Sequence, residues 1–237
     1  MAKDSVEVSM PTKRRRGRPK KSDAPVLSEV ILNVALEHFS HKGFDGTSVR
    51  EMCAELEVSH NLINDRFGGK HALWCATVDY SVSPIVAGIR QVVLEASPTA
   101  TAIEVLRTIV VRFMELNAER PEVLRLISIE GSVESDRLDY FWDNYLTSFY
   151  EILSRYYNAV EGQGLIHTYP PAVFFFLLAH GATAQTSNSA LAKKIMKVDV
   201  EFDGAGLKEF EELDPADPRQ IAVNAEFVAK LLLARPR

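Results

Sequence analysis

Hydrophobic residues recur along this chain with helical spacing. Near the start of the folded region, apolar side chains recur at steps of three and four residues, which places them on one face of a helix that Gly43 ends. These positions are Leu27, Val30, Ile31, Val34, Ala35 and Phe39. Further helical patterns cover residues 99–118, 121–131, 136–160, 170–197 and 218–234, and the VDVEF segment after Lys197 is the only strand candidate. The pattern therefore predicts an all-α fold.

Between these regions the pattern predicts two short helices joined by a three-residue break. Thr47 or Ser48 is placed to cap the first helix, and Glu51 lies three residues after Ser48, as a capping box requires. Its expected inward residues are Val49, Met52, Cys53 and Leu56. Ser59 is placed to cap the second helix, which runs to about Arg66 and ends at the two glycines that follow. The inward residues of this second helix are Leu62 and Ile63.

A long helix is predicted to begin near Lys70. Its apolar face carries Leu73, Trp74, Thr77 and Val78. Pro84 is expected to kink or interrupt it, because proline lacks a backbone N–H and its ring clashes with the preceding turn.

Two short helices with a third packed behind them make a helix-turn-helix, whose second short helix enters the major groove of DNA. The outer surface of this second helix carries polar side chains, namely His60, Asn61, Asn64, Asp65 and Arg66. Asparagine pairs with adenine through two hydrogen bonds, arginine pairs with guanine, and a carboxylate accepts from cytosine. The sequence therefore predicts a base-reading surface from Ser59 to Arg66.

The segment ILNVALEHFSHKGFDGTSVREMCAELEVSHNLINDRFGGKHAL resembles the N-terminal signature of the TetR family of transcriptional regulators. The resemblance covers about residues 30 to 80. It implies phosphate contacts from Thr47, Ser48, Asn64 and Lys70, with His60, Asn61 and Arg66 in or beside the groove. The chain departs from the family where Glu57 replaces the usual turn glycine, and where Asn64 and Arg66 replace the usual tyrosine and histidine. An unusual operator is expected.

The charge is unevenly distributed along the chain. Residues 1–21 hold eight basic against two acidic groups, whereas residues 22–75 hold four basic against eight acidic groups, and the whole chain has a net charge of −5. The segment RRRGRPKK resembles the AT-hook, which lies in the minor groove of A/T-rich DNA. Its expected DNA-binding residues are Arg14, Arg15, Arg16, Arg18, Lys20 and Lys21. A nuclear localisation signal or a solubilising tail is the alternative interpretation of this arm.

The remaining residues have helical content and a length that fit the effector and dimerisation domain implied by the TetR resemblance. Apolar and small residues from Phe174 to Ala184, and others from Ile221 to Leu232, offer faces either for a second copy of the chain or for burial within one subunit. Aromatic residues are dense from Tyr140 to Tyr157. The predicted wall of a largely apolar effector site consists of Phe113, Met114, Trp142, Tyr145 and Phe149, with His180 as a polar contact.

No nucleophile elbow, phosphate loop, paired-carboxylate motif or metal-ligand spacing is present in the sequence, so neither an enzyme nor a cofactor or metal site is predicted. The two cysteines, Cys53 and Cys75, fit buried positions in a reducing cytosol. The predicted organisation is a basic arm (1–25), a helix-turn-helix domain (26–75) and a helical effector and dimerisation domain (76–237). A cytoplasmic homodimeric repressor that binds a palindromic operator is expected. An AT-hook-dominated architectural protein is the first alternative, and an enzyme with an unrecognised site is the second.

Overall fold

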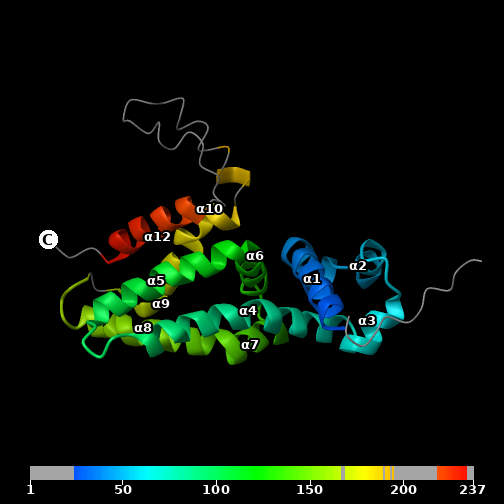
Figure 1. The fold of residues 1–237 in the computed structure, drawn as a ribbon, viewed down its shortest axis with the longest axis horizontal. Coiled ribbons are helices and arrows are strands. Elements are labelled where there is room, and N and C mark those ends of the chain that lie inside the picture. Colours follow the sequence, from blue (N-terminus) through cyan, green and yellow to red (C-terminus); the bar gives the residue numbers. More distant parts are fainter. Residues whose placement is uncertain (1–23, 167–168, 189, 193, 195–217, 234–237) are drawn as a thin grey trace, which may run out of the picture.

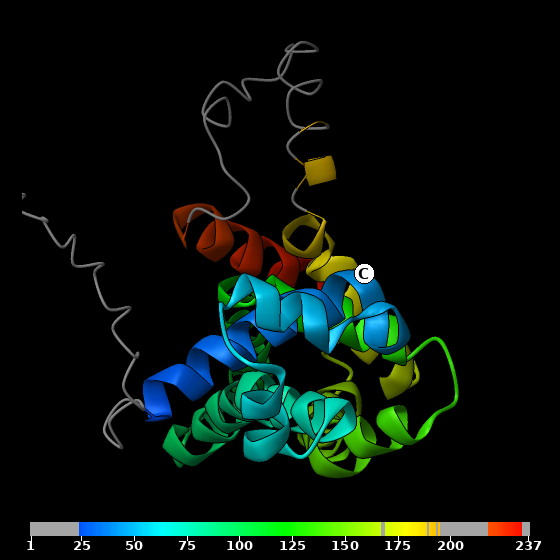
Figure 2. The same ribbon diagram turned by 90° about the vertical axis from the view of Figure 1, so that its right-hand side faces the viewer.

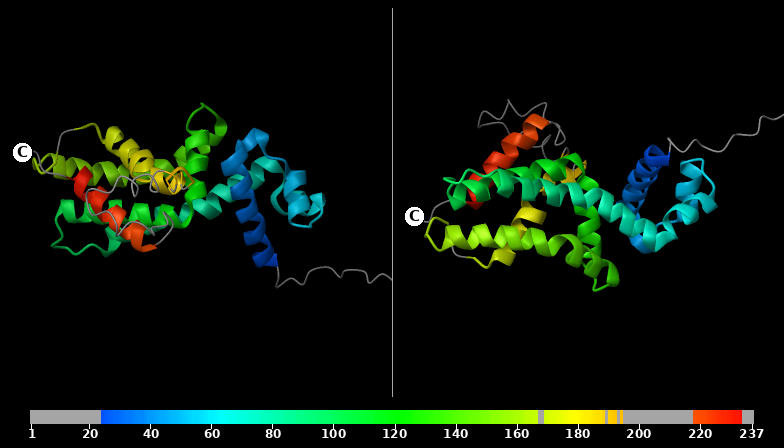
Figure 3. Two further views of the ribbon diagram at one scale, coloured as in Figure 1. Left: turned by 90° about the horizontal axis from the view of Figure 1, so that it is seen from above. Right: turned by 60° about the horizontal axis from the view of Figure 1, so that its bottom comes forward.

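A computed structural model describes residues 24–166, 169–188, 190–192, 194 and 218–233. Every regular element in these ranges is helical, and the expected all-α fold is confirmed. An N-terminal lobe (residues 24–69) is joined through one long helix to a larger body (residues 102–233), as Figures 1 and 3 show. The basic arm and the VDVEF segment lie outside the described residues.

The N-terminal lobe consists of three helices, α1 (Ala24–Gly46), α2 (Val49–Glu55) and α3 (His60–Phe67). Gly43 breaks the regular path of α1 with a φ of 68° and a ψ of 177°, at the position where the sequence predicts its end. The buried stripe of α1 differs from the expected one at three residues, because Leu32 and Leu36 are buried while Val30 is 45% exposed. Figure 2 looks at the molecule from the side of the N-terminal lobe, with its three helices in front of the body.

The connecting helix α4 (Lys70–Glu95) carries the longest buried face in the molecule's described part. Leu73, Trp74, Thr77 and Val78 are all fully buried, as the sequence predicts. Of the two expected effects of Pro84, a kink or an interruption, the interruption does not occur, because α4 continues past the proline to Glu95. Among the described helices, α4 is the one with the length and hydropathy to cross a membrane, but half of that window is buried against neighbouring helices.

The body surrounds the second half of α4. Its first helices are α5 (Ala102–Glu119) and α6 (Pro121–Glu130), and α7 (Asp136–Phe141) continues through a π-helical segment η1 (Trp142–Leu146) into α8 (Thr147–Glu161). After α9 (Pro171–Phe176) a second π-helical segment, η2 (Leu177–Ala182), leads to α10 (Ala184–Ser187), and α12 (Pro218–Leu232) packs on α5. The helices predicted over 136–160 and 170–197 are therefore each divided by a π turn.

Hydrogen bonds between residues that are far apart in the sequence fix α4 against the helices of the body. The carboxylate of Asp79 accepts from the hydroxyls of Tyr140 and Tyr145, both at 2.7 Å, and the hydroxyl of Ser83 donates to Tyr145 at 3.2 Å. Burial, and then the nearby charge and hydrogen bond of Asp79, raise the pKa of Tyr145 to about 12. The phenols therefore stay neutral and keep donating to Asp79 at physiological pH.

Candidate DNA interface

The recognition surface is built on α3, whose two ends are closed by local hydrogen bonds. The hydroxyl of Ser59 accepts from the backbone N–H of Leu62 at 3.3 Å, which confirms the predicted N-cap. At the other end Gly68 adopts a φ of 89°, and its N–H donates to the carbonyl of Asn64 at 2.8 Å. Ile63 is fully buried, so one face of α3 is held by the core while the other is presented to solvent.

The outward face of α3 carries the polar residues that the sequence predicts. His60, Asn61, Asn64 and Asp65 are exposed, as is the capping residue Ser59. The side-chain amide of Asn64 lies 3.1 Å from Nδ1 of His60, so these two residues are already aligned along the helix. Arg66 is only half-buried, and its Nη1 has no hydrogen-bond partner although it is buried. The arrangement leaves donors and acceptors of several kinds on one short helix.

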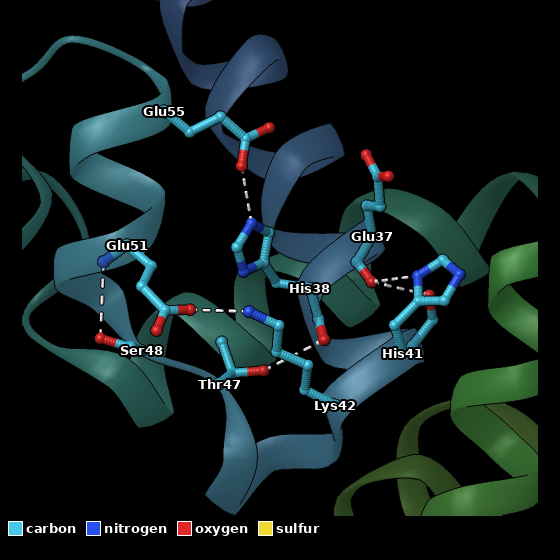
Figure 4. Close-up of polar contacts among 9 residues, drawn as sticks. Glu37, His38, His41, Lys42, Thr47, Ser48, Glu51 and Glu55 are labelled. Carbon is cyan, nitrogen blue, oxygen red and sulfur yellow. Dashed lines mark hydrogen bonds and ion pairs between the residues drawn. The ribbon is translucent and has the colours of Figure 1, made fainter.

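The α2 helix is fastened to α1 by ion pairs and hydrogen bonds, as Figure 4 shows. Nε2 of His38 lies 2.8 Å from the carboxylate of Glu55, and the Lys42 ammonium lies 2.6 Å from that of Glu51. The hydrogen bond from Lys42 lowers the pKa of Glu51. These contacts tie α2 to α1 and so hold the helix-turn-helix in a fixed arrangement.

Thr47, one of the residues expected to contact phosphate, is buried within the lobe. The side chain of Thr47 is 3% exposed, and its hydroxyl lies 2.7 Å from the carbonyl of Gly43 and 3.1 Å from that of His38. That hydroxyl is thus turned inward and does not face the backbone of an incoming DNA.

The predicted capping box at the start of α2 is half-formed. Ser48 accepts from the N–H of Glu51, while the Glu51 carboxylate turns to Lys42.

Two basic residues border the exposed face of the lobe. The Lys70 ammonium donates to the carbonyl of Asp45 at 3.4 Å and lies 4.7 Å from the centre of the Phe44 ring. Arg50, near the start of α2, is exposed and was not singled out from the sequence. Its position one residue after the start of a short helix carries no base-reading signal, so only the structure shows that it lies on the surface of this lobe.

The turn between α2 and α3 takes the geometry that a glycine would favour. The N–H of Val58 donates to the carbonyl of Cys53 at 3.0 Å and the N–H of Glu57 to that of Ala54 at 3.3 Å, which is the Schellman pattern. Glu57 has a φ of 52°, the only positive φ at a non-glycine residue in the described part of the chain. The turn therefore keeps the shape that a glycine would give it, and the backbone at Glu57 is strained.

A small apolar cavity lies in the body between α4, α5, α6 and the two π segments. Its volume is about 30 Å³, and Asn117 and His180 are the only polar residues in its wall. Phe113, Phe149 and His180 line it, as the sequence predicts, and the rings of Phe113 and Phe149 stack with centroids 5.0 Å apart. The wall also contains residues that sequence reasoning missed, namely Val82, Ile85, Val86, Val123, Leu124, Ile127, Leu146, Phe175 and Ala179.

Three of the predicted wall residues lie elsewhere. Trp142 is 47% exposed and packs beside Tyr150, so it does not line this cavity. Tyr145 is hydrogen-bonded to Asp79, and Met114 is buried in the core without lining the cavity. The π turn explains the first difference, because it adds a residue to the turn and rotates the side chains around it away from their α-helical positions.

The cysteines and the metal-binding residue types form no site within the described residues. Cys53 is buried and Cys75 is partly exposed, and burial raises the pKa of both thiols. No group of three His, Cys, Asp or Glu side chains in the described ranges is arranged to hold a metal ion.

Comparisons with known proteins agree with this geometry. Residues 31–76 match the family model of bacterial regulatory proteins of the tetR family. No curated protein matches the chain. Among solved structures, the hemolysin II transcriptional regulator HlyIIR is similar with a TM-score of 0.56 and 23% identity, over 75% of this chain and 94% of that one.

Two further structures extend the similarity over more of the chain. A tetR-family regulatory protein from Rhodococcus RHA1 has a TM-score of 0.57 and 18% identity, over 89% of this chain and 98% of that one. FadR from Bacillus subtilis, in complex with stearoyl-CoA, has a TM-score of 0.58 and 13% identity, over 90% and 100%. These likenesses establish the fold, and regulators of this family act by binding and not by catalysis. The match over residues 31–76, together with the helix-turn-helix geometry, identifies a TetR-type DNA-binding domain in a chain that has the overall fold of these transcriptional regulators.

Proposed function

We propose that this chain is a homodimeric repressor that reads a palindromic operator through α3 and is released from it by a largely apolar effector. The observation that carries this proposal is the outward face of α3, where His60, Asn61, Asn64 and Asp65 are exposed on a helix capped at both ends. Its base-edge chemistry matches that of a helix in the major groove.

The test of the reading surface is selection of bound sequences from a random DNA pool. We expect one palindrome, with half-sites about one helical turn apart. Asn61→Ala should weaken binding to that palindrome about tenfold and relax the preference at one base of each half-site. Asn158→Ala, on the exposed surface of α8, is the matched control and should bind like the wild type. Recovery of unrelated sequences by the wild type would contradict sequence-specific recognition.

The N-terminal arm is proposed to add minor-groove contacts through Arg14 to Lys21, which lie outside the described residues. Because the helix-turn-helix segment is itself net negative, the arm should supply much of the electrostatic affinity. Deleting residues 1–21 should flatten the dependence of log affinity on log salt by about 0.9 for each phosphate that the arm neutralises. An unchanged slope would contradict this role. The architectural alternative would be favoured by two results together. The truncated protein would lose all DNA binding, and the full chain would select DNA only by its A/T content.

A second copy of the chain is proposed to cover the exposed apolar residues of α9, η2 and α12. Phe176 is 60% exposed, Leu177 46% and Leu231 64%, whereas Phe174 and Leu178 face the core of their own subunit. Exposed apolar groups of this size on adjoining elements are typical of a subunit interface. Phe176→Glu should give a monomer in sedimentation experiments. Leu94→Glu, at the exposed end of α4, is the matched control and should remain dimeric. A wild type that is monomeric at all concentrations would contradict the proposal.

The effector is proposed to enter the cavity between α4, α5 and the π segments. Its wall is apolar, but about 30 Å³ is far below the roughly 300–1,000 Å³ of a site for a drug-sized ligand, so binding must open it. The π segments are the parts suited to such a change, since η1 contributes Leu146 and η2 contributes Ala179 and His180, and π turns are frequent at functional sites. An effector that separates these helices from α4 would rotate the N-terminal lobe through α4 itself.

The effector experiment uses fatty acids of graded length and stearoyl-CoA, the ligand of the similar FadR structure. We expect at least one acyl chain to release the selected operator. Leu146→Trp should fill the cavity and abolish that release while leaving operator binding intact, and Leu94→Trp is the matched control. Release that survives Leu146→Trp would place the effector elsewhere.

A further inference from the structure

Two cations from different parts of the molecule lie close to the ring of Phe44. Lys70, at the start of α4, places its ammonium 4.7 Å from the ring centre, and Arg137 of α7 places its guanidinium carbon 4.4 Å from it. Phe44 directly follows the break at Gly43 and stacks on Phe39 inside the N-terminal lobe, with 6.0 Å between ring centroids. The Arg137 contact therefore joins the body to the lobe that carries α3.

Arg137 is held in this place by a buried carboxylate. Its Nε donates to Oε2 of Glu130 at 2.8 Å, and Glu130, at the end of α6, is only 3% exposed. The other carboxylate oxygen, Oε1 of Glu130, is buried without a hydrogen-bond partner. The positive charge of Arg137 therefore stabilises the buried carboxylate. Because a buried carboxylate is costly without a cation, the guanidinium is kept at this point instead of sampling the solvent.

The end of α6 lies directly on the same junction. A side chain at Gly43 would come within 3.6 Å of the Ile129 methyl group, which places α6 against the break in α1. Along α6, the N-terminal lobe is held by apolar packing and by one further polar contact, in which Nη1 of Arg125 lies 3.1 Å from Nε2 of His41. A planar guanidinium fixed by a carboxylate and placed over a ring is directional.

We propose that Arg137 is a positioning residue for DNA recognition, which fastens the N-terminal lobe to the body at Phe44 and so fixes the direction in which each subunit presents α3. The consequence for DNA rests on the proposed dimeric reading of two half-sites, because a small rotation of each lobe changes the separation of the two α3 helices. The fastening itself is a property of one subunit and can be measured without DNA.

The test replaces both charges together, with Glu130→Gln and Arg137→Gln in one variant, so that no unpaired buried charge remains. The matched control neutralises Arg112 and Glu115 in the same way, because this pair is exposed and lies within α5. Hydrogen exchange of backbone amides is measured under native conditions. We expect amides of α2 and α3 to exchange about tenfold faster in the Glu130/Arg137 variant, while α5 and α8 stay unchanged. The control should match the wild type throughout.

A second variant covers the case in which the double replacement does not fold. Phe44→Leu removes the ring and leaves the Glu130–Arg137 pair in place, and it should raise exchange in the same helices. Combined with the charge replacement it should add less than it does alone, because both changes remove the same cation–ring interaction. Exchange that is unchanged in α2 and α3, or that rises equally in every helix, would overturn the positioning role.

Binding to the selected operator gives the functional readout. The Glu130/Arg137 variant should bind the full palindrome about tenfold more weakly and an isolated half-site within about twofold of the wild type, since orientation matters only when two half-sites are read together. Equal losses on both DNAs would overturn the proposal. If the wild type selects no operator, the proposed function fails, and the hydrogen-exchange result still decides whether Arg137 fastens the lobe.

Discussion

The N-terminal lobe and the body of this protein are organised by contacts of different range. In the lobe, the bonds that cap α2 and α3 join residues three to five positions apart, as between Ser59 and Leu62, and the side-chain pairs that tie α2 to α1 span at most seventeen positions. In the body, Asp79 joins Tyr140 and Tyr145 across more than sixty positions, and Phe113 stacks on Phe149. The lobe therefore depends on many small local preferences, whereas the body depends on a few large contacts between distant helices.

This difference leads to a ranking of mutational effects. A local bond such as an N-cap contributes about 1 kcal/mol, whereas truncating a buried aromatic ring costs about 3–5 kcal/mol. Substitutions in the body should therefore reduce stability most, while substitutions in the lobe should reduce it little and act chiefly on DNA binding.

The largest effect is expected for Phe149→Ala in α8. Phe149 is 5% exposed and its ring packs on Phe113 and Phe175, so truncation leaves a cavity and should lower the free energy of unfolding by about 3–5 kcal/mol. Urea denaturation followed by circular dichroism measures this loss, with Phe149→Leu as the milder control. A loss below about 1 kcal/mol would contradict the view that long-range packing holds the body together.

The next effect is expected for Asp79→Ala in α4. Both tyrosine hydroxyls lose a charged acceptor, and hydrogen bonds to charged groups are worth about 1.5–3 kcal/mol, so stability should fall by about 2–3 kcal/mol. The pKa of Tyr145 should also fall from about 12 toward its ordinary value, because part of the upward shift comes from Asp79. Ultraviolet titration of the phenols measures this change. Asp139→Ala, on the exposed surface of α7, is the control and should change neither quantity.

The range of the contacts also explains which features could be predicted from the sequence. The caps at Ser48 and Ser59 and the break at Gly43 could be predicted, because each depends on a residue and its immediate neighbours. The outward face of α3 could be predicted for the same reason, since residues one or two positions from the buried Ile63, such as Asn61 and Asp65, point away from it in an α-helix. The fold class followed from the periodicity.

The features that could not be predicted depend on packing between distant segments. The continuity of α4 through Pro84 is one, because the buried residues on either side, Val82 and Ile85, hold the helix in place while the proline itself is exposed. The π turn at Trp142 is another, and it moved that residue out of the predicted cavity wall. The inward hydroxyl of Thr47 was missed because its acceptors, Gly43 and His38, become neighbours only once the end of α1 has folded.

A smaller effect is expected at the cap of α3. Ser59→Ala removes the acceptor for the N–H of Leu62 and should cost about 1 kcal/mol of stability. Because the loss is confined to the start of α3, hydrogen exchange should rise in that helix and remain unchanged in α8. Ser154→Ala in α8, where the hydroxyl bonds to a carbonyl of its own helix, is the control and should be nearly neutral. A uniform rise in exchange after Ser59→Ala would contradict a local role.

The smallest effect, and the one of opposite sign, is expected at the turn between α2 and α3. The same Schellman hydrogen bonds close α2 and α8, but the left-handed position is Glu57 in the lobe, with a φ of 52°, and Gly164 in the body, with a φ of 68°. A residue with a side chain is strained by about 1–2 kcal/mol in the left-handed conformation. Glycine avoids this strain, but its unfolded chain is more flexible, so folding costs about 0.5–1 kcal/mol more conformational entropy than for other residues. Glu57→Gly should therefore stabilise the protein by about 0.5–1 kcal/mol.

Gly164→Ala is the reverse substitution, because it adds a side chain at a left-handed position that now holds glycine. An added Cβ at Gly164 meets no atom within 4 Å, so only the backbone strain changes, and stability should fall by about 0.5–1 kcal/mol. Thermal unfolding of both single variants and of the double variant measures the two changes in the free energy of unfolding. These changes should add, because the two turns lie in separate parts of the molecule. If Glu57→Gly were instead destabilising, the glutamate side chain would have to make a contact that outweighs its backbone strain. Because that side chain is exposed, such a contact is not expected.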